Sequence, residues 1–289
     1  MSVLMKARAK INLSLEVSRK RKNGYHDLLT VMQSIDIYDT INIEKNDSGK
    51  ITLSSNISDI PMAENIAVRA AEAFYQKKGS CKGCHIKLHK EIPMQAGMAG
   101  GSTDAAAVLV GLNKIYGYPL SDREIHDLAG KLGADVPFCL VGGTKKAFGI
   151  GDEFMDLPHI DLFLVIVKPD EGISTATLFK MLDRNDLTSG ERTLKAVRSI
   201  CAGDKRGLFQ HMTNGLYNKS LVLVPEMDEI IQTMENEFGA QKAMMSGSGS
   251  TVFGVFETVE KQSGAYDHFS KKYNNVYKTR TAEESISFL

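Results

Sequence analysis

Apolar and polar residues alternate strictly near the start of the chain. The apolar positions are Ala9, Ile11, Leu13, Leu15 and Val17, and the polar residues between them are Lys10, Asn12, Ser14 and Glu16. This period of two predicts a half-buried strand, with Lys10 and Asn12 on the same face. Asn23-Gly24 then indicates a turn. Alternating isoleucines at positions 35, 37, 41 and 43 predict further strands of one antiparallel region.

Three segments have the period of an amphipathic helix. Asn65 is a candidate N-cap for an apolar stripe of Ala67, Ala70, Ala71, Phe74 and Tyr75. A second helix follows a glycine-rich loop, which we expect to extend from Pro93 to Thr103. Ser121 and Glu124 form a capping-box pattern for a third helix that ends at Gly133. Later in the chain, residues 225–238 predict a further helix with Gly239 as its terminator.

The order of these elements indicates an α+β fold, because strands and helices mix without regular β-α alternation. The length of 289 residues favours two modest domains or one large one. A short apolar run at residues 162–167 predicts the first strand of the second domain. We therefore expect one domain at residues 1–155 and another at residues 156–289.

Composition limits the classes of partner. Lys plus Arg and Asp plus Glu both number 35, so the net charge of +0 gives no general attraction for nucleic acid or anionic lipid. Any anion site must be local. No stretch has the length of a membrane span, and no signal-peptide pattern is present, so we expect a soluble cytoplasmic protein with no membrane partner. The four cysteines are expected to be reduced thiols.

Two of the cysteines and a histidine form a short motif that some proteins use to bind haem. Cys81, Cys84 and His85 match the C-x-x-C-H pattern of covalent haem attachment. That chemistry belongs to exported proteins, and Cys139 and Cys201 are too isolated in sequence to complete a four-ligand zinc site. We expect neither haem nor structural zinc here, and a turn before a strand instead.

The strongest chemical signal is the loop of small residues before the second helix. Its residues are Pro93, Met94, Gln95, Ala96, Gly97, Met98, Ala99, Gly100, Gly101, Ser102 and Thr103. Glycines allow a ligand to approach the backbone, and a helix N-terminus presents unpaired N-H groups, so polyphosphate is the natural ligand. It is not a Walker A sequence. A tight structural turn is the alternative, and the residues alone leave both open.

Two more segments are candidates for chemistry. Residues 245–251 form a second Gly/Ser-rich loop, which either closes over phosphates or is a flexible connection between a helix and a strand. Asp135 is a single carboxylate among apolar neighbours. It is either a helix cap or a catalytic group.

Six ordered blocks resemble one family. They are A-K-I-N-L at 9–13, N-G-Y-H-D-L at 23–28, T-V-M-Q-S-I-D at 30–36, the loop at 93–104, G-A-D-V-P-F at 133–138 and M-S-G-S-G-S-T-V-F at 245–253. Together they resemble the diphosphocytidyl-methylerythritol kinases of the GHMP superfamily. The resemblance implies an N-terminal domain like the ribosomal S5 second domain and a ferredoxin-like C-terminal domain.

The same resemblance implies an activity. This is ATP-dependent phosphorylation of the 2-hydroxyl of 4-diphosphocytidyl-2-C-methyl-D-erythritol, in the non-mevalonate isoprenoid pathway, with Mg²⁺ as cofactor. Asp135 matches the catalytic aspartate that orients the hydroxyl and accepts its proton. Lys10 matches the lysine beside it, which stabilises that negative charge and contacts the transferred phosphate. A buried structural ion pair is the alternative.

Binding residues are also carried over by resemblance. Tyr25 and His26 match cytidine contacts, and Phe179, after Ser174-Thr175, matches a ring that stacks on cytosine. Asn12 is expected at the methylerythritol diphosphate end of the substrate, Asn65 beside adenine, and residues 93–103 around the ATP phosphates. No protein metal ligand is assigned.

The chain departs from the family pattern in two places. Ala99 replaces a frequent glycine, which is tolerated if its φ is negative. Met32 stands where an aromatic ring sometimes packs on the base. Thr103 keeps a hydroxyl able to bind phosphate or metal.

Two other function classes compete. Another GHMP kinase, acting on mevalonate, homoserine or a sugar, would keep Lys10, Asp135 and the loop without needing the cytidine residues. A non-catalytic or RNA-binding module with an S5-like domain fits the neutral charge and the Lys10-Asp135 combination poorly. We expect a monomer or weak homodimer whose partners are its small-molecule substrate and ATP.

Overall fold

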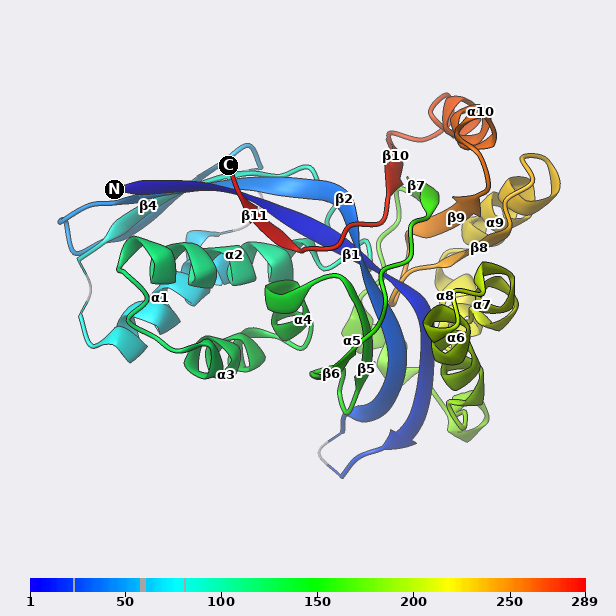
Figure 1. Cartoon of the computed structure of the whole chain (residues 1–289), viewed down its shortest axis with the longest axis horizontal. Helices are drawn as coiled ribbons and strands as arrows, with labels where there is room; N and C mark the ends of the chain where they lie inside the picture. The colour runs from blue at the N-terminus through cyan, green and yellow to red at the C-terminus, as the bar shows by residue number, and fades with distance from the viewer. Residues whose placement is uncertain (23, 58–60, 81) are drawn as a thin grey trace.

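The computed structural model describes residues 1–22, 24–57, 61–80 and 82–289. These residues form two sheets with helices packed around each, and Figure 1 shows the first sheet on the left and the second on the right. The mixture of helices and antiparallel strands confirms the α+β prediction.

The first sheet is built around two long strands. β1 is Ser2–Lys20 and β2 is His26–Lys45. Its hydrogen-bonded order is β11-β1-β2-β4-β3, with β5 pairing to β2 and β6 pairing to β5. The shorter strands are β3 Ile51–Ser55, β4 Cys84–His89, β5 Thr144–Phe148, β6 Glu153–Asp156 and β11 Ile286–Phe288. Among the named strands of the described residues, only β3 and β4 pair in parallel.

Helices α1, Ile66–Lys78, and α2, Gly100–Ile115, cover one face of this sheet. The Asn65 side chain caps α1 by accepting from Ala67 N at 2.9 Å, and the predicted apolar stripe of α1 is buried. Helix α3, Asp122–Leu132, begins with the predicted capping box at Ser121. Helix α4, Val136–Val141, follows at once. Capping residues thus located α1 and α3 correctly.

The second sheet is antiparallel, in the order β10-β7-β9-β8. Its strands are β7 Phe163–Lys168, β8 Lys242–Met245, β9 Val252–Phe256 and β10 Asn275–Arg280. One face packs on α9, Glu226–Asn236, and α10, Val259–Phe269, and the other packs on α6, Glu191–Cys201, and α7, Lys205–His211. The remaining helices are α5 Thr175–Lys180, α8 Tyr217–Leu223 and two short 3-10 helices, Met62–Glu64 and Arg184–Asp186.

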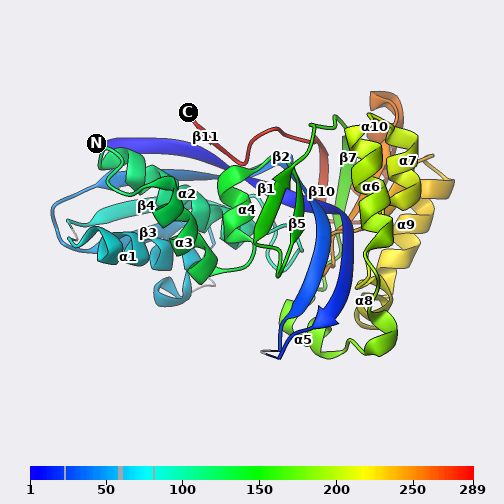
Figure 2. The same cartoon turned by 60° about the horizontal axis from the view of Figure 1, so that its bottom comes forward.

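The far half of the β1-β2 hairpin extends beyond the first helical layer. Figure 2 shows it passing between β5 and α6, with α5 below its tip. Residues 9–17 of β1 are buried on both faces, so the expectation of a half-buried strand is wrong there. The polar side chains are covered because the elements of the second sheet pack over them; Ser14 Oγ, for example, lies 2.7 Å from Thr193 Oγ1 of α6.

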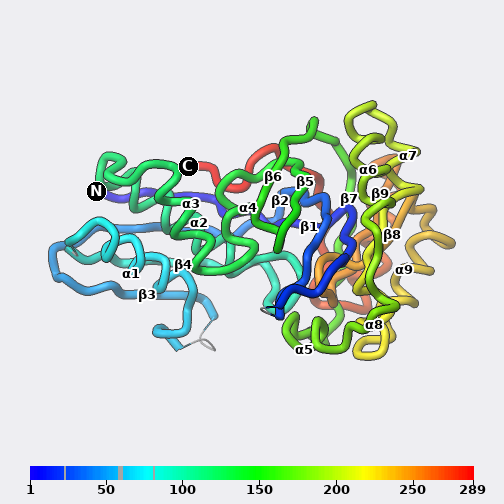
Figure 3. Tube along the Cα trace, turned by 90° about the horizontal axis from the view of Figure 1, so that it is seen from below, coloured from blue at the N-terminus to red at the C-terminus, as the bar shows by residue number. Residues whose placement is uncertain are grey.

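The last strand returns to the start of the chain. β11 pairs antiparallel with β1 at Met5 to Ala7, and Figure 3 shows both termini on the same side of the molecule. C-terminal residues therefore contribute to the first sheet, and the proposed division after residue 155 stays a prediction. No helix within the described ranges is long and apolar enough to cross a bilayer.

Two element boundaries differ from the sequence expectation. Helix α2 begins at Gly100, so the last four residues of the predicted loop are already helical. Consecutive glycines carry a weak helical preference, and here tertiary packing overrides it. Pro225 is the N-cap of α9 and lies just outside its first turn.

Candidate active site

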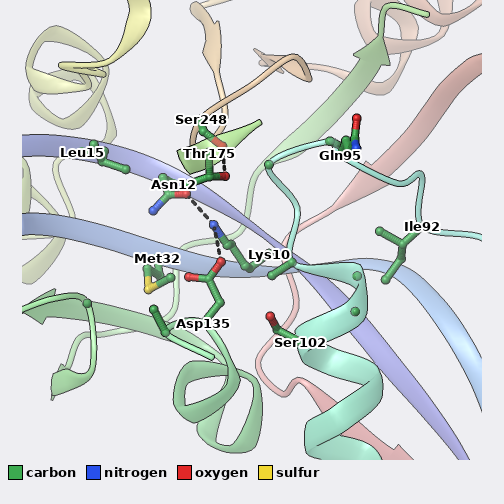
Figure 4. A pocket seen from close by; sticks show the side chains of 18 of the residues that line it. Lys10, Asn12, Leu15, Met32, Ile92, Gln95, Ser102, Asp135, Thr175 and Ser248 are labelled. Carbon is green, nitrogen blue, oxygen red and sulfur yellow. Dashed lines mark hydrogen bonds and ion pairs between the residues drawn. The ribbon is translucent and has the colours of Figure 1, made fainter. Parts of the chain in front are cut away.

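A cavity of about 560 Å³ lies between the β1-β2 hairpin, the loop before α2, α4 and the second Gly/Ser-rich loop. Figure 4 shows Lys10 at its centre, between Asn12 and Asp135. Because Lys10 and Asn12 are two residues apart on β1, their side chains point to the same side, as the alternation predicted.

Lys10 joins two polar partners. Its Nζ atom donates to Asn12 Oδ1 at 2.9 Å and lies 3.5 Å from Asp135 Oδ2. The Lys10 side chain is buried, whereas 38% of the Asp135 side chain is accessible. Asn12 Nδ2 in turn donates to Thr30 Oγ1 at 2.8 Å, which fixes its amide. The site therefore holds a buried cation beside a carboxylate that a ligand can reach.

Asp135 stands at the N-cap position of α4, but its side chain makes no capping hydrogen bond. The structure thus answers one question that the sequence left open: the carboxylate does not cap the helix and lines the cavity instead. Behind it, Cys139 is fully buried, and burial, followed by the nearby Asp135, raises the pKa of its thiol.

The loop before α2 forms one wall of the cavity. All its predicted residues line the cavity except Met98 and Thr103. Met98 is buried in the core, and its carbonyl accepts from Lys10 N of β1 at 3.1 Å. The first turn of α2 has no acidic residue and no side-chain cap, so its N-H groups are available to an anion.

Two loop predictions differ from the structure. Thr103 is fully buried and its hydroxyl faces Ser285 Oγ at 3.5 Å, so Ser102, not Thr103, presents a hydroxyl to the cavity. Ala99 has φ 59°, in the left-handed region, and not the negative φ that we expected of a tolerated alanine. The αL turn there directs the chain into α2, and a side chain makes it strained.

The two Gly-rich loops touch each other. Ser246 Oγ donates to Gly97 O at 3.1 Å, and a Cβ added to Gly97 would lie 2.3 Å from Ser246 O. Asn214 Nδ2 holds the second loop by donating to Met245 O and Gly247 O, each at 2.9 Å. The second loop is therefore held by side-chain hydrogen bonds to the first loop and to Asn214.

The predicted cytidine residues gather at the tip of the hairpin. The rings of His26 and Phe179 lie 5.5 Å apart, and Tyr25 beside them is 58% exposed. His26 Nδ1 is buried and has no hydrogen-bond partner among the described residues. Burial, assisted by Lys20, lowers the pKa of His26, so its ring is mainly neutral near pH 7.

The cavity extends toward this aromatic pair. Leu28 lines it two residues after His26, and Thr175 lines it one helical turn before Phe179 on α5. Thr175 Oγ1 lies 2.7 Å from Ser248 Oγ of the second loop. Asn65 is outside this cavity and lines an adjoining one of about 160 Å³, together with Ile66, Met94 and Gly101.

Sequence reasoning missed several residues of the cavity. Thr30, Lys90 and Ile150 line it, as do Leu15, Leu28, Ile66, Ile92, Ala134 and Gly151. Cross-strand pairing was the available signal for Thr30, since it lies on β2 near Asn12. No three His, Cys, Asp or Glu side chains within the described residues gather as a metal site. Cys81 lies outside the described residues, so the prediction for the cysteine pair stays untested.

Comparison with known proteins identifies the family. The model for the GHMP kinase N-terminal domain matches residues 65–143, and that for the C-terminal domain matches residues 196–275. The 4-diphosphocytidyl-2-C-methyl-D-erythritol kinase of Alkaliphilus oremlandii (strain OhILAs) is 40% identical over 283 residues, covering 96% of both chains. The chain belongs to the 4-diphosphocytidyl-2-C-methyl-D-erythritol kinase family of GHMP kinases.

Three further comparisons agree with the GHMP kinase fold. The same-named kinase of Desulfitobacterium hafniense (strain Y51) is 39% identical over 97% of this chain and 96% of its own. A crystal structure of a 4-(cytidine 5'-diphospho)-2C-methyl-D-erythritol kinase superposes with a TM-score of 0.83 at 29% identity, covering 98% and 99% of the two chains. The homoserine kinase of Cytophaga hutchinsonii, at 17% identity and a TM-score of 0.81, shares the fold alone.

Proposed function

We propose that this kinase transfers the γ-phosphoryl group of ATP to the 2-hydroxyl of 4-diphosphocytidyl-2-C-methyl-D-erythritol. Relatives named 4-diphosphocytidyl-2-C-methyl-D-erythritol kinase match almost the whole chain. The observation that carries the chemistry is the Lys10-Asp135 pair, 3.5 Å apart beside an uncapped helix N-terminus. One side of the cavity thus suits phosphate and the other suits an alcohol.

In the proposed reaction, the substrate hydroxyl oxygen forms a bond to the γ-phosphorus while the bond from that phosphorus to the bridging oxygen breaks. ADP leaves with the electron pair, and Asp135 takes the hydroxyl proton. Because this transition state is loose, the protein mainly aligns the two reactants and offsets charge on the moving group. Lys10 supplies a fixed positive charge for that purpose, and Asn12 holds Lys10 in place.

The N-terminal turn of α2 and the loop at 93–102 would bind the ATP phosphates, because their backbone lines the cavity. The adjoining cavity at Asn65 is the proposed place of the adenine ring. Its lining of Ile66 and Met94 is apolar, which suits a flat base.

Mg²⁺ usually binds through one or two carboxylates together with substrate phosphates and waters. Asp135 and the Ser102 hydroxyl line the cavity and offer such a donor set, which fits an ion carried by the nucleotide. These two residues would hold it, and the ion would neutralise charge on the ATP phosphates. A cage of protein ligands is not required.

The cytidine end is assigned to His26, Tyr25 and Phe179. A neutral His26 with a buried, unpartnered Nδ1 is suited to hydrogen-bond a base edge, and an aromatic ring stacks well on any base. These cytidine-binding residues distinguish the proposed activity from homoserine or mevalonate kinase activity, which the shared fold alone permits.

A substrate panel tests the proposal. With Mg·ATP, the purified protein should form ADP with the cytidine diphosphate substrate and not with mevalonate, homoserine or galactose. Preferential turnover of one of the other three alcohols contradicts the proposal.

A further inference from the structure

A buried lysine stands at the entrance to the phosphate loop. Lys90 follows β4 directly, and its side chain is only 9% accessible. Its ammonium donates to the carboxyl group of Asp39 and, at 2.6 Å, to Asp104 Oδ2. Asp39 belongs to β2 and Asp104 to α2, so three elements meet at one charge.

Asp39 also holds the backbone where the loop begins. This carboxylate is fully buried, and its Oδ1 accepts from Glu91 N at 2.7 Å and from Ile92 N at 2.9 Å. Its other oxygen accepts from Lys90. From the second sheet, Tyr277 Oη donates to Glu91 O at 3.0 Å.

The ammonium of Lys90 lies against the start of α2. A Cβ added to Gly100, the first residue of that helix, would lie 3.3 Å from Lys90 Nζ. Lys90 lines the main cavity, whereas Asp39 and Asp104 do not. Lys90 and Asp104 also both line the adjoining cavity at Asn65, so of the three charged groups only the ammonium faces the main cavity.

The electrostatics of the cluster agree with a retained ammonium. Burial opposes the charge, but attraction to Asp104 and then to Asp39 raises the pKa of Lys90 above its usual value. Burial raises the pKa of Asp104 well above the ordinary range, although Lys90 acts in the opposite direction.

A buried ion pair is a poor source of stability, because desolvation cancels much of the attraction. We propose that Asp39 is a positioning residue for the nucleotide phosphates, acting through Lys90, whose ammonium it holds at the N-terminus of α2. Lys90 then adds a fixed charge to the helix N-H groups where ATP phosphate binds. This inference rests on the proposed ATP site.

Asp39→Asn removes the contact between Asp39 and Lys90 and keeps the contacts of Asp39 with the backbone. The amide oxygen of asparagine still accepts from Glu91 N and Ile92 N, while its NH₂ group replaces the oxygen that Lys90 contacts. We expect the Kd of Mg·ATP, measured by calorimetry, to rise roughly ten-fold or more, as for loss of a charged hydrogen bond. The Kd of the cytidine substrate should stay unchanged. Asp36→Asn, the same change on the same strand outside the cavity, should alter neither constant.

A double-mutant cycle distinguishes positioning from general loosening. In a Lys90→Met background, Asp39→Asn should weaken ATP binding by less than about two-fold, within the scatter of additivity. If Lys90→Met does not fold, Lys90→Gln serves as the background. Equal weakening with and without Lys90, or unchanged ATP affinity in the Asp39→Asn protein, overturns the inference. Absence of Mg·ATP binding by the unmodified protein would instead contradict the proposed function.

Discussion

The Nζ atom of Lys10 lies 3.5 Å from Oδ2 of Asp135, although the two residues come from different elements far apart in the sequence. β1 presents the lysine and the start of α4 presents the carboxylate. This relationship links the sheet, the helical layer and the cavity, and the first prediction tests it.

Asp135→Asn and Lys10→Ala should each lower kcat by at least roughly 100-fold, because proton acceptance or a fixed charge in the transition state is lost. Asp127→Asn, an exposed residue on α3, is the matched control. Steady-state kinetics with circular dichroism checks both the rate and the fold. Near-normal turnover in a folded variant would remove that residue from catalysis.

Phe179→Ala should raise the KM of the cytidine substrate roughly ten-fold, since a stacking face of about 1–3 kcal/mol is removed. The KM of ATP should hardly change. Phe148→Ala removes a ring of β5 outside the cavity and should change neither constant. Weakened ATP binding with intact substrate binding would reverse the assignment of the two ends of the cavity.

Contact between the two Gly-rich loops can be tested with two glycines of similar backbone geometry. Gly97 and Gly79 have φ of 68° and 82°, but only at Gly97 would a Cβ meet another backbone, 2.3 Å from Ser246 O. Gly79→Ala should lower the free energy of unfolding by about 1 kcal/mol and leave kcat intact. Gly97→Ala should cost more stability and lower activity as well. Denaturant unfolding and kinetics together decide this, and equal effects would show that the loop contact is unimportant.

How far the sequence could predict the site depended on the kind of signal. Strand periodicity placed Lys10 and Asn12 on one face, and capping residues located α1 and α3, because both signals are local. The Asp39-Lys90 contact joins β2 to the end of β4 through tertiary packing, so no local sequence pattern could predict it. Likewise, the αL backbone at Ala99 follows from how the loop enters α2 and contradicts the preference of alanine.

The αL backbone at Ala99 predicts that glycine changes the free energy of unfolding in opposite directions at Ala99 and at Ala73. Ala99→Gly should raise the free energy of unfolding by up to about 1 kcal/mol, because relief of αL strain exceeds the added freedom of the unfolded chain. The same change at Ala73, within α1, should lower it by about 1 kcal/mol. Chemical denaturation measures both. Destabilisation at both positions would show that Ala99 is not strained.

This kinase is proposed to transfer the γ-phosphoryl group of ATP to one alcohol of a cytidine diphosphate substrate. The most direct measurement follows γ-labelled Mg·ATP and 4-diphosphocytidyl-2-C-methyl-D-erythritol to their products, by chromatography and ³¹P NMR. We expect ADP and a labelled 2-phosphomonoester in equal amounts, with the diphosphate link to cytidine intact. Label released as inorganic phosphate, or found on any other position of the substrate, would contradict it.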